Sequence, residues 1–154
     1  MGYDKKMMDI AFRQAQLAYS AGEVPIGAVV CRNGEVVARA KNAREKTQSA
    51  IGHAELIAIK KACEKLKSWR LDDCELYVTV EPCLMCLGAA MNARIPIVYF
   101  GAFDYNGSVK RLVGDDSFNA LNANVKLIKA EGEERCAKIL TEFFSARRVK
   151  SKNL

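Results

Sequence analysis

His53 is the single histidine of this 154-residue sequence, and its spacing from one glutamate and two cysteines suits metal chemistry. Glu55 follows it by two residues, and Pro82 precedes a Cys83-x-x-Cys86 pair further along the chain. One imidazole and two thiolates make three zinc ligands. A zinc ion with three protein ligands keeps its fourth tetrahedral position for water, whereas a closed structural site uses four. The sequence therefore predicts a catalytic zinc site formed by His53, Cys83 and Cys86.

Glu55 is the predicted proton shuttle of this site. Zinc lowers the pKa of a bound water molecule to about 7. A carboxylate that is not a ligand can accept the water's proton and deliver it to a ring nitrogen and then to a departing amine. Hydroxide attack on an amidine-like ring carbon with loss of ammonia is hydrolytic deamination. The sequence contains no glycine-rich phosphate loop and no Gly-x-Ser-x-Gly elbow, so we expect no nucleotide cofactor and no serine nucleophile.

Each part of this pattern also has a plainer interpretation. A Cys-x-x-Cys pair can be two buried thiols or a redox pair, and a lone histidine can cap a helix. A structural zinc module would need a fourth ligand, which Cys74 or Cys136 could supply. The glutamate two residues after the histidine and the proline before the first cysteine favour the catalytic site.

Composition and length indicate one globular domain spanning residues 1–154, with 50% apolar and 27% charged residues. The first ten residues lack the apolar core of a signal peptide, and no apolar run approaches the roughly 20 residues needed to cross a bilayer. We therefore expect a cytoplasmic protein without a membrane partner. The four cysteines outside the predicted site are expected to be small buried side chains. The net charge of +6 is compatible with a polyanionic partner.

Hydrophobic periodicity and turn signals predict the elements that position the site. Helices are expected over 5–20, 53–67, 83–94, 117–121 and 131–149, and strands over 23–31, 35–40, 74–80, 95–101 and 125–128. Residues 41–52 and most of 102–123 are expected to be loops. Gly27 in the first strand suggests a bulge, tight packing or close approach to a ligand. This order of elements predicts an α/β fold in which helices cover both faces of a mixed five-stranded sheet, and two facing helix starts bring His53 to the cysteines.

The C-terminal segment combines two aromatic residues with a basic cluster. Phe143 and Phe144 lie close to Arg147 and Arg148, and two lysines follow. Such a mixture suits a nucleic-acid backbone with bases stacked nearby. A solvated helix end whose cations favour the C-terminal dipole is the alternative.

The chain resembles the bacterial tRNA-specific adenosine deaminases of the cytidine deaminase-like superfamily. The His-x-Glu and Pro-Cys-x-x-Cys signature is that of the zinc deaminases as a whole. The segments that resemble the tRNA enzymes more narrowly are 22–29, Asn42, 76–86, 94–96, 100–102 and 143–148. The resemblance implies a three-layer α/β/α sandwich, a homodimer with one zinc ion per subunit, and hydrolysis of adenosine to inosine at the wobble position of the tRNA anticodon loop.

The resemblance also implies roles for individual residues. Asn42 contacts the flipped nucleotide, Ala54 belongs to the substrate site, and Asp104 lies near the pocket. The chain departs from the family at 49–52, where such enzymes usually carry Pro-Thr-Ala, at the loop 104–110, and at 118–120, where they carry Asn-His. Because these positions shape substrate contacts, deamination of a free base or nucleoside (guanine, cytosine or cytidine) stays open as an alternative. A zinc-stabilised RNA-binding module without activity is a third interpretation.

Overall fold

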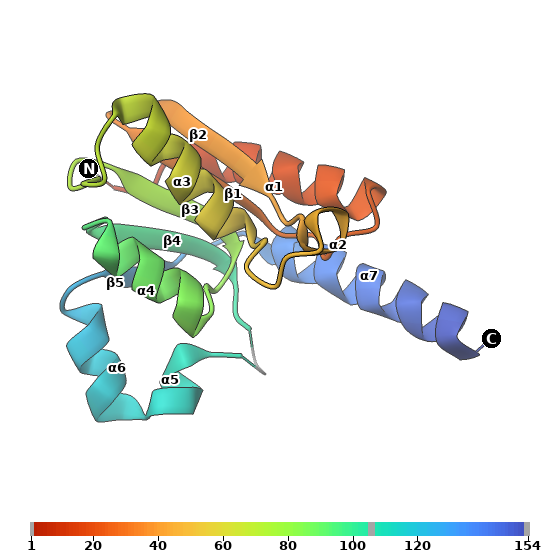
Figure 1. Cartoon of the computed structure of the whole chain (residues 1–154). Helices are drawn as coiled ribbons and strands as arrows, with labels where there is room; N and C mark the ends of the chain where they lie inside the picture. The colour runs from red at the N-terminus through yellow and green to blue at the C-terminus, as the bar shows by residue number, and fades with distance from the viewer. Residues whose placement is uncertain (1, 105–106, 153–154) are drawn as a thin grey trace.

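A computed structural model of the chain describes residues 2–104 and 107–152, with side chains as far as residue 150 (Figure 1). Its centre is a five-stranded sheet in the order β2-β1-β3-β4-β5. The strands are β1 (Gly27–Arg32), β2 (Glu35–Lys41), β3 (Glu75–Val80), β4 (Ile97–Ala102) and β5 (Lys126–Lys129). β1 runs antiparallel to β2 and β3, whereas β3, β4 and β5 are parallel. The predicted mixed five-stranded sheet is confirmed.

Helices cover both faces of this sheet, with α1 and α7 on one face and α3 and α4 on the other (Figure 1). The helices are α1 (Lys5–Ser20), α2 (Arg44–Thr47), α3 (Ala54–Leu66), α4 (Leu84–Asn92), α5 (Val109–Val113), α6 (Asp115–Asn122) and α7 (Glu134–Lys152). Alternate strand residues point to opposite faces. Val29 and Tyr77 therefore pack beneath α1, whereas Val30 and Val78 belong to the cluster that packs against α3 and α4. The three-layer α/β/α sandwich is thus built from two apolar cores.

Two sequence signals in the first hairpin have clear structural reasons. Asn33 and Gly34 both have positive φ, 52° and 77°, as a tight turn between β1 and β2 requires. Gly27 packs against α1, because a Cβ atom there would lie 1.9 Å from the carbonyl oxygen of Ala11 and 2.6 Å from the amide nitrogen of Ala15. Of the reasons considered for Gly27, tight packing is therefore the one observed.

The structure corrects the predicted loops. The 41–52 segment contains the short helix α2, and the 102–123 connection contains α5 as well as a longer α6 than expected. Residues 23–26 precede β1 and are not part of the strand. α2 depends on a distant contact: the buried Glu23 carboxylate accepts the backbone N–H groups of Glu45 and Lys46 at 3.0 and 2.8 Å. Residues 105 and 106 of the predicted 104–110 loop lie outside the described residues.

The cysteines outside the predicted site are free thiols. Cys31, Cys74 and Cys136 are buried as expected, whereas Cys63 is partly exposed. None of the helices in the described part of the chain has the length and apolarity that crossing a membrane requires.

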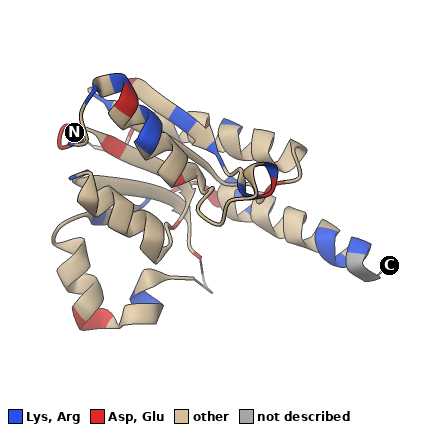
Figure 2. Cartoon of the chain, in the orientation of Figure 1, with Lys and Arg blue, Asp and Glu red and all other residues tan. Residues whose placement is uncertain are grey.

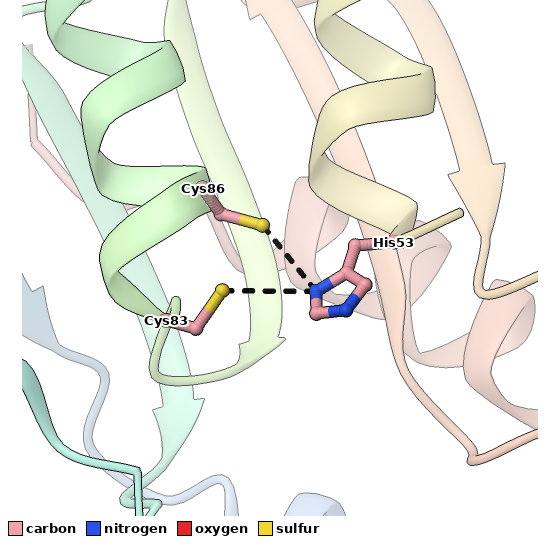
Figure 3. Close-up of side chains that lie close together, drawn as sticks. All are labelled: His53, Cys83 and Cys86. Atoms are coloured by element: carbon pink, nitrogen blue, oxygen red, sulfur yellow. Dashed lines mark hydrogen bonds between the residues drawn. The ribbon is translucent and has the colours of Figure 1, made fainter. Parts of the chain in front are cut away.

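The predicted site lies at the carboxyl ends of the parallel strands β3 and β4. Cys83 and Cys86 follow β3 directly, and Asp104 follows β4. Ligands in α/β sheets bind at this edge, because the connections that leave the strands converge there. The N-terminus of α3 reaches the same edge and brings His53 with it (Figure 3).

Candidate metal centre and active site

His53, Cys83 and Cys86 converge from the N-termini of two helices (Figure 3). His53 is the N-cap of α3, with extended backbone angles of φ −81° and ψ 144°, and Cys83 occupies the same position in α4. Cys86 lies in the first turn of α4 and is fully buried. The Nδ1 atom of His53 is 3.7 Å from Sγ of Cys83 and 3.5 Å from Sγ of Cys86. The predicted convergence of the three side chains is therefore observed.

These distances fit a tetrahedral metal ion. Zinc–nitrogen and zinc–sulfur bonds of about 2.05 and 2.3 Å at a tetrahedral angle would place the nitrogen and sulfur atoms about 3.6 Å apart. All the ligand atoms lie within 4.8 Å of one another, and among the described residues the cluster contains only these three. Cys74 and Cys136, the fourth ligands considered from the sequence, do not belong to it. The arrangement has the ligand number of an open site rather than a closed structural one.

Glu55 lies in the first turn of α3, beside the ligand cluster but not part of it. Its side chain is 4% exposed, and within the described residues its Oε1 atom has no hydrogen-bond partner. A buried polar atom without a partner is rare and calls for a specific reason, such as a catalytic role or an absent ligand. Burial raises the pKa of Glu55 above its ordinary value. This carboxylate is therefore placed to exchange a proton with a small molecule in the site.

The site opens into a cavity of about 280 Å³, which we call the base cavity. Its lining includes His53 and Glu55 as well as the predicted substrate residues Asn42 and Ala54. Asn42 is buried, its Nδ2 donates to the carbonyl oxygen of Val24 at 3.4 Å, and its Oδ1 has no partner among the described residues. Two unpartnered acceptors, one from Asn42 and one from Glu55, thus line one cavity and would suit a substrate rich in N–H donors.

The electrostatics of the two cysteines are unequal. A hydrogen bond from the Cys86 thiol lowers the pKa of Cys83 to about 4, and the same bond together with burial raises the pKa of Cys86. A hydrogen bond with Cys83 raises the pKa of His53. Both sulfurs must be thiolates to bind a metal, so metal binding releases any proton that a cysteine thiol holds.

A larger open depression of about 1,020 Å³ adjoins the base cavity and shares Val24 and Ile26 with it. We call it the α7 depression. Three of the predicted substrate and RNA residues line it, namely Asp104, Phe144 and Arg148. The fold therefore brings together, beside the site, one residue predicted to contact the substrate and two residues predicted to contact RNA.

The other two predicted RNA residues have different environments. Phe143 is 6% exposed and packs edge-on against Tyr19, so its ring is a core element of this chain, and its assignment to RNA binding stays a prediction. The Arg147 guanidinium lies 4.7 Å from the centre of the Phe143 ring, and one of its nitrogens is 3.5 Å from the carbonyl oxygen of Gly22. Phe143 thus supports an exposed cation, whereas Phe144 is 42% exposed.

Sequence reasoning missed two buried carboxylates that hold the loops around the site. Glu23 fixes α2, whose first residue, Arg44, lines the base cavity. Glu81 accepts the backbone N–H of Asp104 and the hydroxyl of Ser108, both at 3.3 Å. An acidic residue directly before or directly after an apolar run was the available signal, because such a residue must find donors when it is buried.

Comparison with known proteins places the chain among deaminases. The model of the MafB19-like deaminase family matches residues 3–148. The tRNA-specific adenosine deaminase of Bacillus subtilis (strain 168) is 42% identical over 156 aligned residues, which cover 99% of this chain and 95% of that protein. A structure from work on A-to-I editing by tRNA:A34 deaminases matches with a TM-score of 0.80 and 35% identity, covering 89% of this chain and 100% of the other. A guanine deaminase of Bacillus subtilis matches with a TM-score of 0.64 and 35% identity, covering 77% and 75%.

Proposed function

This chain belongs to the tRNA-specific adenosine deaminases within the MafB19-like deaminase family, and from that premise we propose that it hydrolyses adenosine to inosine at the wobble position of tRNA. The observation that carries the proposal is the Oε1 atom of Glu55, which has no partner among the described residues and lies in a cavity beside three candidate metal ligands. Such a carboxylate has the position that a general acid and base needs. We treat residues 1–154 as one zinc-dependent deaminase domain.

His53, Cys83 and Cys86 would hold one zinc ion per subunit. When bound, zinc would supply the Lewis acidity that makes a water molecule reactive at neutral pH. Glu55 would accept one proton from that water and deliver it to a ring nitrogen of the purine. It would then take the second proton from the hydroxyl group added to the ring and pass it to the amine as it departs. One water molecule enters and one ammonia leaves, so adenosine becomes inosine.

Asn42 and Ala54 would position the base. The Oδ1 atom of Asn42, which has no partner among the described residues, can accept a hydrogen bond from the flipped nucleotide. Ala54 is the first residue of α3, so its backbone N–H has no partner within the helix and is available to the substrate. Both residues line the base cavity, which supports their assignment to substrate binding.

The α7 depression would receive the nucleotides that flank the flipped base. Single-stranded RNA is bound through aromatic stacking and cationic contacts to phosphates. Exposed Phe144 can stack on a base, and Arg147 and Arg148 can contact phosphates. Asp104 in the same depression would contact the RNA loop beside the pocket.

A homodimer is the second part of the proposal. Ile51, Leu84 and Met85 are 62%, 46% and 38% exposed, and they belong to the two segments that carry the metal ligands. Exposed apolar side chains gathered in one region are typical of a protein interface.

A tRNA-modifying enzyme of this kind would act in the cytoplasm.

Ammonia release by the zinc-loaded protein tests the function. An anticodon stem-loop with wobble adenosine is compared with free adenine, guanine, cytosine and their nucleosides, and the same stem-loop with wobble guanosine is the matched control. We expect turnover on the adenosine stem-loop alone. Turnover on free guanine or cytosine with none on the stem-loop would overturn the proposal and establish the free-base alternative.

A further inference from the structure

A second concave surface lies on the other side of residues 42–44 from the base cavity. This open groove of about 960 Å³ runs between β2, α2 and α3, and four lysines line it, which are Lys41, Lys46, Lys60 and Lys61. Glu64 is the carboxylate in the same lining. We call this surface the lysine groove. Its four ammonium groups and one carboxylate leave an excess of three positive charges.

These positive charges are available to a ligand. Lys46, Lys60 and Lys61 are exposed, and none of the ion pairs formed among the described residues involves any of the four lysines. The Lys61 ammonium donates to the carbonyl oxygen of Arg39 at 3.4 Å, a contact that leaves its charge uncompensated. Figure 2 shows Lys and Arg on β2 and along α3 around this surface.

Protection of the sheet edge explains only part of this pattern. β2 is an edge strand, and lysines on edge strands prevent pairing with other chains. That reason accounts for Lys41, which belongs to β2. It does not account for Lys46 on α2 or for Lys60 and Lys61 on α3, which face the same groove.

The groove and the base cavity share one wall. Lys41 and Ala43 line the groove, whereas the intervening Asn42 and the following Arg44 line the base cavity. A polynucleotide with one base in the base cavity therefore has phosphates within reach of this wall, with Arg44 between the two surfaces. We propose that the lysine groove binds the phosphate backbone of the RNA substrate next to the flipped nucleotide. This inference rests on the proposed function and adds a surface to it.

The test removes three exposed charges from the groove without touching the catalytic site. The variant Lys46→Gln/Lys60→Gln/Lys61→Gln is compared with Lys6→Gln/Lys67→Gln/Lys126→Gln, which removes three exposed lysine charges elsewhere. Binding of a labelled anticodon stem-loop is measured by fluorescence anisotropy at several salt concentrations. The slope of log K against log salt is negative, and each lost phosphate contact reduces its magnitude by about 0.7 to 0.9.

For the groove variant we expect the magnitude of this slope to fall by about 2 and the affinity for the stem-loop at 0.1 M salt to fall about tenfold or more. Its single-turnover rate at saturating RNA should be unchanged. The control variant should stay near wild type. Equal slopes and affinities in the two triple variants would overturn the inference, and so would a loss confined to the single-turnover rate. The single variant Lys60→Gln repeats the test with the smallest change.

Failure of this inference is distinct from failure of the proposed function. A wild-type protein that does not deaminate the stem-loop contradicts the function itself. A wild-type protein that does so, with the groove variant equal to its control, contradicts the lysine groove alone.

Discussion

Replacing Glu55 by glutamine tests the proposed chemistry most directly. Glutamine has nearly the same shape as glutamate but cannot take up and release the proton at neutral pH. Glu55 is not part of the metal cluster, so the variant should retain one zinc ion per chain. Because the side chain is 4% exposed and its Oε1 has no partner among the described residues, the change replaces a buried ionisable group by a neutral group of nearly the same shape.

The expected size of the effect follows from the role. General acid–base catalysis by one residue contributes about 10²- to 10⁴-fold to the rate, or roughly 2.7 to 5.4 kcal/mol of activation free energy. Glu55 would serve more than one proton transfer, so we expect a loss of kcat at the upper end of this range. The free energy of unfolding should change by no more than about 1 kcal/mol, because glutamine also leaves a polar group unpaired at this position.

The assay combines inosine formation from the stem-loop with zinc content and thermal unfolding of the same preparation. Glu131→Gln, an exposed carboxylate before α7, is the matched control and should behave as wild type. A Glu55→Gln enzyme within tenfold of the wild-type rate would refute the assignment of Glu55. Loss of zinc together with activity would instead mean that Glu55 helps to hold the metal.

Three further changes follow from the same structure. Glu23→Ala removes the carboxylate that accepts two backbone N–H groups of α2. In steady-state kinetics we expect the KM for the stem-loop to rise about tenfold, or 1.4 kcal/mol, with a smaller change in kcat. An unchanged KM would contradict the role of Glu23 in holding this loop. Gly27→Ala places a Cβ atom 1.9 Å from a backbone oxygen of α1, so we expect the free energy of unfolding, measured by chemical denaturation, to fall by about 3 kcal/mol or more. In the control Gly88→Ala the added Cβ atom meets nothing within 4 Å, and the free energy of unfolding should not fall. Removal of zinc by a chelator should abolish deamination while the circular dichroism spectrum persists, and adding zinc back should restore activity. Unfolding of the protein on chelation would instead indicate a structural metal site.

The order of elements could be predicted from sequence because each signal is local. Compact apolar and β-branched runs indicated the strands, helical periodicity indicated the major helices, and Asn33-Gly34 indicated the first hairpin. The short helix α2 could not be predicted, because it is stabilised by the side chain of Glu23, which accepts the backbone N–H groups of Glu45 and Lys46 much further along the chain. Contacts of this kind depend on the fold and leave no periodic trace in the sequence.

The candidate chemistry could be predicted from the sequence, because a single histidine, a glutamate two residues later and a Pro-Cys-x-x-Cys pair form the pattern of a three-ligand metal site. The structure was needed to show that neither Cys74 nor Cys136 joins these three side chains. Only the tertiary structure decided which nearby side chains share a surface with that chemistry. Phe143 and Phe144 are neighbours in the chain, yet one is buried in the core and the other lines the α7 depression, because successive helix positions point about 100° apart. The four lysines of the groove come from three elements, and packing of α2 and α3 beside β2 brings their charges together.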